Sequence, residues 1–246
     1  KVALVTGGAR GIGRGCALAL AGAGFDLALV DLLAPELART ADEIRALGRE
    51  AMTFEADVSS FADAQRIGAE VATRFGRIDA LVNNAGRSAP KGVLEIEEAE
   101  FDAAIAINLK SCFNYIRAVA PTMLAQGGGR IVSMSSMNAH TGGVTAAVSR
   151  FAYAAAKAGI VGMTRALAKE LGPTILVNAV CPGVIETEIG NTLTRERGAR
   201  LAAEGISLRR MGKPDDVAQL VLFLAASQPC FITGQAINVD GFQFHI

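Results

Sequence analysis

The stretch KVALVTGGARGIG, residues 1–13, decides the fold of this chain. It sets an apolar run directly before a turn that carries Gly7, Gly11 and Gly13, and a helical pattern follows the turn. A buried strand, a glycine-rich turn and a helix in this order are typical of the first unit of a parallel sheet with crossover helices. If this interpretation holds, the rest of the chain should repeat the unit.

Apolar runs and helix-length segments do alternate along the 246 residues. The further runs are DLALVD (26–31), EAMTFEAD (50–57), IDALVNNAG (78–86), RIVSMSS (130–136), ILVNAVCPG (175–183) and AINVD (236–240). Helices are expected within 35–47, 60–75, 98–125, 151–171 and 214–226. Runs rich in Val, Ile and Leu suit strands that are covered on both faces. The sequence therefore predicts a single-domain α/β fold, a doubly wound parallel sheet of about seven strands with helices on both faces.

Composition argues against several classes of protein. The chain has 24 Lys and Arg against 24 Asp and Glu, without a basic block, so it lacks the charge pattern of a nucleic-acid-binding protein. Its four cysteines lie far apart and it has two histidines, which argues against a metal site and favours reduced thiols in the cytoplasm. The longest apolar run, 217–226, contains Gln219 and is shorter than the ~20 residues of a membrane span. We expect no nucleic acid, metal or membrane partner.

Polar and glycine motifs fall at the carboxyl ends of the expected strands. They are TGGARGIG (6–13), Asp31, NNAG (83–86), SMSS (133–136) and CPG (181–183). Ligands of doubly wound sheets bind beyond these strand ends. The convergence of five signals predicts one ligand site along one edge of the sheet.

The glycine turn predicts a dinucleotide site. Gly7, Gly11 and Gly13 would let the backbone approach a pyrophosphate at the positive end of a helix. Asp31, 20 residues after Gly11, could accept hydrogen bonds from the adenosine ribose. Because a carboxylate repels a 2′-phosphate, we expect NAD to be preferred. Arg10, within the turn, could reach a 2′-phosphate, so NADP stays open.

Tyr153 and Lys157 form the candidate catalytic pair in FAYAAAKAGI, residues 151–160. Residues four apart share one face of a helix, so the ammonium can lie near the phenol oxygen. A free tyrosine hydroxyl, with a pKa of about 10, is a poor base at neutral pH. An ammonium group beside a phenol favours the phenolate form. The pair therefore suits proton transfer at a carbonyl or alcohol oxygen.

TGGARGIG, NNAG, Ser136, YAAAK and CPGVIET, in this order and spacing, resemble the motifs of the classical short-chain dehydrogenases/reductases. The resemblance runs from Val2 to NVDG, residues 238–241, and includes members that act as 3-oxoacyl-(acyl-carrier-protein) reductases and as polyol or sugar dehydrogenases. It implies one NAD(P)-binding Rossmann-type domain over 1–246 and an oxidoreductase acting on CH–OH groups.

The resemblance also implies residue roles. Tyr153 would be the acid/base, Lys157 would hold the nicotinamide ribose, Ser136 the substrate oxygen, and the backbone of Asn108 a water leading toward the lysine. Cofactor contacts are implied for Gly7, Arg10, Gly11, Ile12, Gly13, Asp31, Asp57, Val58, Asn84, Gly86, Tyr153, Lys157, Ile185 and Thr187.

The residues alone leave some of these roles open. Ser133 and Ser135 compete with Ser136 as the substrate-binding serine. Asn108 could instead be a polar residue that kinks a core helix, and Asp57 could belong to the start of a helix.

Three departures from the family pattern bear on the substrate. Ser136 and Tyr153 are 17 residues apart where the family typically has about four fewer, so a longer loop is expected beside the cleft. Phe242 stands where a second glycine is usual, which predicts an altered contact near the C-terminus. NNAG is followed by Arg87 and Ser88 where small apolar residues are common.

The expected substrate pocket is polar. Its candidate residues are Arg87, Ser88, Ser136, Asn138, His140 and Glu186. Such groups favour a sugar, polyol or hydroxy acid. A 3-oxoacyl-(acyl-carrier-protein) reductase is the alternative, although that activity normally uses NADPH and Asp31 argues against it. A catalytically silent dinucleotide-sensing or scaffolding protein is an alternative of another class.

Two further expectations concern mobility and assembly. Residues 186–214 are expected to form a lid over the pocket. The segments 98–125 and 151–171 carry small residues on several faces, so they could pack on the sheet and on a partner helix. Together with the family resemblance, this predicts a homotetramer.

Overall fold

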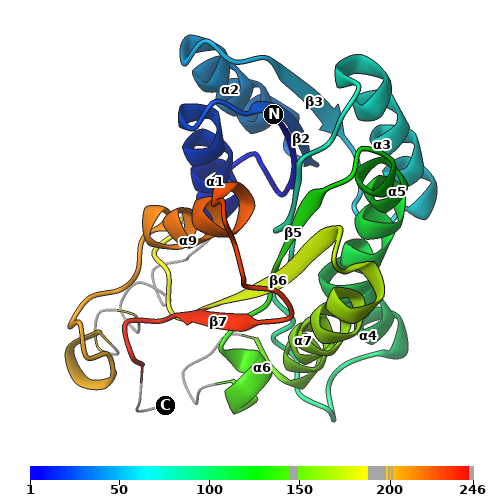
Figure 1. The fold of residues 1–246 in the computed structure, drawn as a ribbon. Coiled ribbons are helices and arrows are strands. Elements are labelled where there is room, and N and C mark those ends of the chain that lie inside the picture. The colour runs from blue at the N-terminus through cyan, green and yellow to red at the C-terminus, as the bar shows by residue number, and fades with distance from the viewer. Residues whose placement is uncertain (144–148, 188–197, 199, 201, 244–246) are drawn as a thin grey trace.

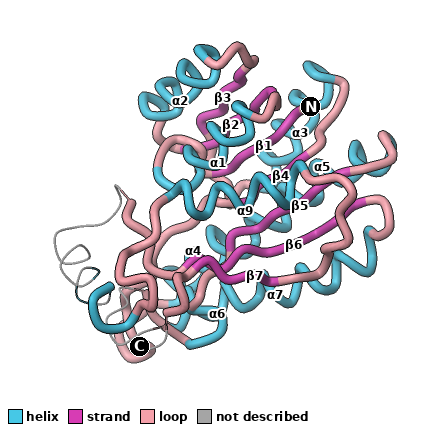
Figure 2. The backbone as a smooth tube through the Cα atoms, turned by 60° about the vertical axis from the view of Figure 1, so that its left-hand side comes forward, coloured by secondary structure: helices cyan, strands magenta, loops and turns pink. Residues whose placement is uncertain are grey.

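The computed structural model describes residues 1–143, 149–187, 198, 200 and 202–243 (Figure 1). Within them, seven parallel strands form one sheet in the order β3-β2-β1-β4-β5-β6-β7, from one edge to the other (Figure 2). The strands are β1 (Val2–Thr6), β2 (Asp26–Asp31), β3 (Ala51–Glu55), β4 (Ala80–Asn83), β5 (Gly129–Met134), β6 (Ile175–Pro182) and β7 (Ala236–Val239). The predicted doubly wound α/β fold is confirmed.

The chain reverses its direction across the sheet between β1 and β4. After β1 it builds outward to β2 and β3, then returns to place β4 on the other side of β1. The register aligns Thr6 with both Val30 and Asn83, so these strand ends meet. A crevice opens at such a reversal, and it is where open α/β sheets bind ligands.

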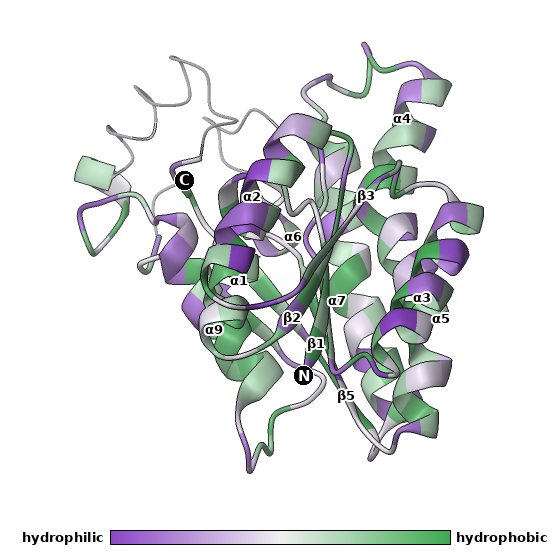
Figure 3. Cartoon of the chain, turned by 90° about the horizontal axis from the view of Figure 1, so that it is seen from above, coloured by the Kyte–Doolittle hydropathy of each residue, from purple (hydrophilic) through white to green (hydrophobic). Residues whose placement is uncertain are grey.

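Helices cover both faces of the sheet (Figure 1). One face carries α1 (Gly11–Gly22), α2 (Ala34–Ala46) and α9 (Pro214–Ala226). The other carries α3 (Phe61–Phe75), α5 (Ser111–Ala125) and α7 (Phe151–Leu171). The apolar faces of these helices pack against the sheet in two separate core layers. Viewed from above, the strands between the layers are largely hydrophobic (Figure 3).

The two edge strands depart from the expectation that every strand is covered on both faces. All of β1 and β4 is buried, but in β3 only Phe54 is buried, and β7 has no fully buried residue. An edge strand has a neighbour on one side only, so fewer side chains cover it. The continuous apolar pattern is thus correct for the centre of the sheet and wrong at its edges.

The expected helix 98–125 contains an irregularity that the sequence pattern does not predict. It comprises α4 (Glu98–Ile105), a π-helical turn η1 (Ala106–Lys110) and α5. Such wide turns inside helices are often found at functional sites. A short helix, α6 (Asn138–Thr141), was also not expected.

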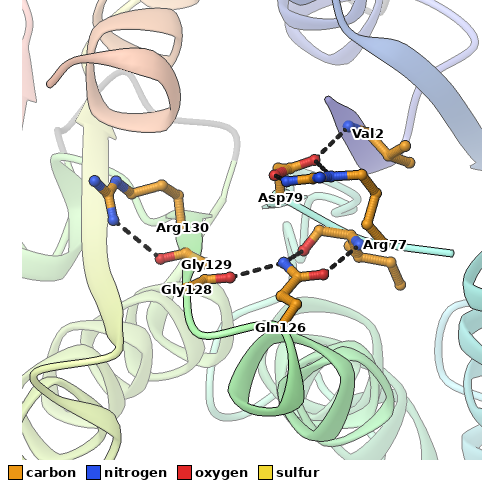
Figure 4. A network of polar contacts seen from close by, with 8 residues as sticks. Val2, Arg77, Asp79, Gln126, Gly128, Gly129 and Arg130 are labelled. Carbon is orange, nitrogen blue, oxygen red and sulfur yellow. Dashed lines mark hydrogen bonds and ion pairs between the residues drawn. The ribbon is translucent and has the colours of Figure 1, made fainter.

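A network of polar contacts closes the amino end of the sheet (Figure 4). The Asp79 carboxylate accepts hydrogen bonds from the Val2 backbone N–H at 2.7 Å and from the Arg77 guanidinium at 2.6 and 2.8 Å. Burial raises the pKa of Asp79, but the contacts from Arg77 and Val2 outweigh it and leave this pKa below its ordinary value.

Gln126 completes this network (Figure 4). Its side-chain amide donates to the carbonyl oxygens of Ile78 and Gly128, both at 2.7 Å, and accepts from the Ile78 backbone N–H at 3.1 Å. The side chain thereby ties the end of α5 to the start of β4.

No helix in the described part of the chain is long and apolar enough to cross a membrane.

Candidate active site

A cleft of about 710 Å³ opens at the carboxyl edge of the sheet. The predicted site residues that line it are Gly7, Arg10, Ile12, Asp31, Asp57, Val58, Asn84, Gly86, Arg87, Ser88, Ser136, Asn138, Tyr153, Lys157, Ile185 and Thr187. Five predicted residues do not line it: Gly11, Gly13, Asn108, His140 and Glu186. The strand ends therefore bring most of the predicted site together.

The turn between β1 and α1 has a backbone that requires glycine. Gly7 and Gly11 adopt left-handed conformations with φ of +67° and +56°. A Cβ on Gly13 would lie 1.9 Å from the carbonyl oxygen of Gly7, so no side chain fits between the turn and the helix. The first turn of α1 carries no acidic side chain, which leaves its positive end for an anion.

Asn84 and Thr6 fasten this turn to the end of β4. The Asn84 side chain donates to the carbonyl oxygens of Thr6 and Gly7, both at 3.1 Å. The Thr6 hydroxyl accepts from the backbone N–H groups of Asn84 and Ala85 at 3.0 and 3.2 Å. The two strands on either side of the crevice thus hold each other's loops in place.

Asp31 at the end of β2 is oriented by the backbone. Its two carboxylate oxygens accept hydrogen bonds from the N–H groups of Ala9, at 3.1 Å, and Leu33, at 3.2 Å. Arg10 also lines the cleft, and within the described ranges its guanidinium has no hydrogen-bond or ion-pair partner. A fixed carboxylate and a free cation therefore lie on the same side of the cleft.

Asp57 and Val58 form a neighbouring wall. Asp57 accepts from the Ser59 backbone N–H at 2.9 Å, while Ser60 caps α3 by accepting from the Asp63 N–H. Asp57 thus lies just before the start of α3, which agrees with the alternative that it belongs to a helix start. It also lines the cleft, as a cofactor contact would require.

Asn114 supports that wall from behind, a role that sequence reasoning missed. Its side chain donates to the carbonyl oxygens of Val58 and Ser59, both at 3.1 Å. The signal for it was a polar residue within a mostly apolar helix, which by itself does not reveal what the residue contacts.

Tyr153 and Lys157 lie one turn apart on α7, on the floor of the cleft. The Lys157 Nζ is 5.5 Å from the centroid of the Tyr153 ring. Lys157 is 2% exposed and donates to the carbonyl oxygen of Met134 at 2.7 Å. A Cβ on Gly86 would lie 3.5 Å from this Nζ. A buried ammonium in contact with one carbonyl keeps its remaining N–H groups for other partners.

The three candidate serines differ in what their hydroxyls contact. Ser133 is buried and accepts from the Asn83 side chain at 3.2 Å. Ser135 is buried and donates to the Lys157 carbonyl oxygen at 2.8 Å. Ser136 lines the cleft, and its hydroxyl oxygen accepts from the Asn138 backbone N–H at 3.2 Å. Unlike the buried Ser133 and Ser135, Ser136 is half-buried at the cleft, and its O–H has no acceptor in the described structure.

Asn108 lies behind the cleft, buried in the π-helical turn. Its side-chain oxygen accepts from the Arg87 N–H at 3.0 Å, and its amide donates to the carbonyl oxygens of Arg87 and Ala104 at 2.9 and 3.0 Å. The side chain therefore holds the loop after β4. This arrangement agrees with a polar residue at an irregular turn and leaves the implied backbone role as a prediction.

The predicted substrate residues are only partly brought together. Arg87, Ser88 and Asn138 line the cleft. His140 does not, because it lies on the exposed side of α6. Glu186 does not either, because its backbone pairs with Gly212 and its side chain is exposed. Residues 144–148 of the long loop lie outside the described residues.

Gln243 enters the cleft although sequence reasoning did not select it. It is 9% exposed and lines the cleft, and its side-chain oxygen accepts from the Val184 N–H at 3.2 Å. The adjacent Phe242 has a φ of +56° and is 73% exposed. Phe242, which stands where the family usually has glycine, thus adopts a left-handed backbone conformation, and the next residue, Gln243, lines the cleft.

Within the expected lid, 186–214, residues 188–197, 199 and 201 lie outside the described residues. Near the end of this segment, Arg210 forms a bidentate ion pair with Asp216, with N–O distances of 2.7 and 2.8 Å. The hydrogen bonds from Arg210 and from the Lys213 backbone N–H lower the pKa of Asp216 to about 2. This pair ties the segment before α9 to its first turn.

The comparisons with known proteins agree on the family. A family model described as enoyl-(acyl carrier protein) reductase matches residues 7–241. The 3-oxoacyl-(acyl-carrier-protein) reductase FabG of Thermotoga maritima is 38% identical over 242 residues, covering 98% of this chain and 96% of the relative. The oxidoreductase UcpA of Salmonella typhimurium is 38% identical over 249 residues, covering 98% and 93%.

A solved structure agrees with them. It is described as that of a short-chain alcohol dehydrogenase from Sinorhizobium meliloti 1021, superposes with a TM-score of 0.91 and is 34% identical, covering 98% of this chain and 95% of that one. From these matches together with the fold and the site, the chain belongs to the short-chain dehydrogenase/reductase family of oxidoreductases.

Proposed function

We propose that this protein transfers a hydride between NAD(P) and the carbonyl or alcohol carbon of a small polar substrate, with Tyr153 as the general acid/base. The observation that carries the proposal is that Tyr153, Lys157 and Ser136 line the same cleft as the glycine turn and Asp31. A proton donor or acceptor and a dinucleotide cradle in one cleft are what this reaction requires.

The residues of the cleft fit a dinucleotide. The left-handed Gly7, the close approach of Gly13 to Gly7 and the unopposed end of α1 suit a pyrophosphate. The Asp31 carboxylate suits a ribose hydroxyl. By family resemblance, Asp57 and Val58 would contact the adenine, and Ile185 and Thr187 the nicotinamide amide. A bound nicotinamide supplies or accepts the hydride.

Tyr153 and Lys157 divide the proton chemistry. The phenol hydroxyl gives its proton to a carbonyl oxygen during reduction, and the phenolate takes one from an alcohol during oxidation. The neighbouring ammonium stabilises the phenolate. The Met134 carbonyl oxygen holds that ammonium in the buried floor of the cleft, which suits it to keep its charge near the phenol.

Ser136 orients the substrate oxygen. Because its hydroxyl oxygen already accepts from the Asn138 N–H, its own hydrogen is directed to another acceptor. A carbonyl or hydroxyl oxygen of the substrate is the acceptor that fits this role.

Asp31 supports a preference for NAD, and the free Arg10 opposes it. The carboxylate is held by two backbone N–H groups and is thus not available to move away from a 2′-phosphate. We expect kcat/KM to be higher with NAD than with NADP. A strong preference for NADP would refute the Asp31 argument.

The substrate class is supported by the polar groups at the cleft mouth, Arg87, Ser88 and Asn138. They favour a sugar, polyol or hydroxy acid. The named activity of the FabG relatives supports the second candidate, a 3-oxoacyl-(acyl-carrier-protein) reductase. A screen of sugars, polyols, hydroxy acids and acetoacetyl thioesters with both nucleotides separates the two. Nucleotide binding without turnover of any of them would support a sensing or scaffolding protein instead.

We also infer a homotetramer in the cytoplasm. In support, Ala155, Ala158 and Gly162 form an exposed stripe of small residues on α7, where a helix of another copy could approach closely. A scattering mass equal to one chain would overturn the assembly.

A further inference from the structure

Gln243 reaches the cleft from just beyond the NVDG motif, and neither composition nor the family motifs single it out. It follows β7 and is 9% exposed, yet it forms part of the cleft wall. Its neighbours on that wall are Gly183 and Val184, which follow β6. Because β6 and β7 lie at the opposite side of the sheet from β2 and β3, Gln243 is far from the Asp31 end of the cleft.

Gln243 lies instead beside the catalytic end. The Met137 N–H donates to the carbonyl oxygen of Pro182 at 3.0 Å, so the segment after Ser136 is bonded to the segment that Gln243 contacts. The wall that carries Gln243 is thus continuous with the wall that carries the candidate substrate-binding serine.

The orientation of the Gln243 amide follows from its partner. The Val184 backbone N–H is a donor, so the atom that faces it at 3.2 Å must be the side-chain oxygen. A Cβ on Gly183 would lie 2.7 Å from this oxygen, so only glycine lets the amide lie so close. The Nε2 group is therefore the free end, and among the described residues the one side-chain hydrogen bond of Gln243 is made by its oxygen.

The backbone at Phe242 explains why Gln243 points inward. Phe242 has a φ of +56°, a left-handed backbone conformation that residues other than glycine rarely adopt. Its carbonyl oxygen accepts from the Ser207 N–H at 3.2 Å, and Gln243 forms an antiparallel bridge with Ile206. This bend leaves Phe242 73% exposed while the next side chain is buried in the cleft wall.

We propose that Gln243 determines substrate specificity by donating a hydrogen bond from Nε2 to an oxygen of the substrate. The inference rests on the proposed function, since it assumes turnover in this cleft. A fixed amide that shows only its N–H₂ end selects an acceptor, such as a hydroxyl, a carbonyl or a carboxylate, and disfavours an apolar chain. Gln243 thereby adds a neutral donor to the polar groups of the pocket.

The test compares Gln243→Met with wild type, using sorbitol and 3-hydroxybutyrate as the probes alongside the best substrate of the activity screen. Methionine keeps the length of the side chain and removes the donor. We expect KM for the oxygenated substrate to rise about 3- to 10-fold, with kcat changed less than KM and the Kd for NADH unchanged. Gln235→Met, on an exposed loop before β7, is the matched control and should leave KM as in wild type.

Gln243→Glu adds a test of charge. It can still accept from the Val184 N–H, but it replaces the donor by a negative oxygen. We expect KM for an anionic hydroxy acid to rise more than KM for a neutral polyol. If the methionine variant fails to fold, Gln243→Asn withdraws the amide by one methylene and should give the same rise in KM.

The outcomes separate the two proposals. A wild-type protein that binds NADH but turns over none of the probes overturns the proposed function and this inference with it. An active wild type whose KM stays within twofold in folded Gln243→Met, with normal NADH binding, overturns only the role of Gln243. A parallel rise in the Kd for NADH would also contradict it, because the residue would then act on the nucleotide end.

Discussion

The two ends of the same sheet use polar groups in opposite ways. At the amino end, Arg77 donates to Asp79, and Gln126 bonds to the backbone of Ile78 and Gly128 (Figure 4). At the carboxyl end, Arg10 and the hydroxyl hydrogen of Ser136 have no partner among the described residues. Crossover helices begin after the strands, so the positive end of α1 also lies there. At the amino end the polar groups are paired within the protein and stabilise the fold. At the carboxyl end polar groups are left unpaired and can bind a ligand.

The largest effect that this contrast predicts is on catalysis. Tyr153→Phe removes only the hydroxyl, so kcat should fall about 10²- to 10⁴-fold while the Kd for NADH and the melting temperature stay near wild type. Steady-state kinetics and NADH fluorescence titration check both parts. Undiminished turnover would show that another group transfers the proton.

The glycine turn should respond next most strongly. Gly13→Ala places a Cβ 1.9 Å from the Gly7 carbonyl oxygen, so the turn has to move. We expect NADH affinity to fall on the order of 10²-fold, because small displacements of a binding backbone have large effects. Gly22→Ala is the matched control at the other end of α1, where a Cβ meets nothing within 4 Å. Equal NADH affinity in the two variants would contradict the role of the turn.

The amino end should show a change in stability without a change in activity. Asp79→Asn loses the ion pair with Arg77, and we expect the free energy of unfolding at pH 7 to fall by about 1–3 kcal/mol. Urea denaturation measures it, and kcat/KM should stay as in wild type. A loss of activity in the folded variant would break the separation of the two ends.

The same carboxylate predicts a pH dependence. The pKa of Asp79 is lower in the folded protein than its ordinary value of about 3.9, so folding favours the ionised form. Its contribution to stability is therefore full at neutral pH and is lost as the pH falls below about 4, through the folded pKa. Unfolding curves of wild type and Asp79→Asn should converge in that acidic range. A constant difference down to pH 2 would argue against the assignment.

The smallest effect concerns Phe242. Phe242→Gly removes the steric penalty of the left-handed backbone, about 1–2 kcal/mol, but adds freedom to the unfolded chain, about 0.5–1 kcal/mol. The free energy of unfolding should therefore rise by about 0.5 kcal/mol. Calorimetry of both proteins checks the sign. A clear destabilisation would mean that the Phe242 ring contributes more than its 73% exposure indicates.

Much of the architecture was predictable because local patterns reflect it. The strands and the main helices follow apolar runs and their periodicity, and the TGGARGIG turn marks the first crossover. The π-helical turn at Asn108 was not predictable, because its irregularity is stabilised by bonds to Arg87, which lies on another loop. The exposure of β3 was likewise not predictable. It follows from the position of β3 at the edge of the sheet, and the apolar run does not show which strand lies at the edge.

For the site, the sequence by itself determined the chemical groups and the strand ends that carry them, from the glycine turn to Tyr153 and Lys157. Only the tertiary structure decided which of three serines keeps a free hydroxyl at the cleft, that His140 and Glu186 point elsewhere, and that Gln243 enters from beyond β7. The reason is physical. Residue spacing fixes neighbours along one helix or strand, whereas side-chain exposure and hydrogen-bond partners depend on segments that meet only when the sheet is assembled.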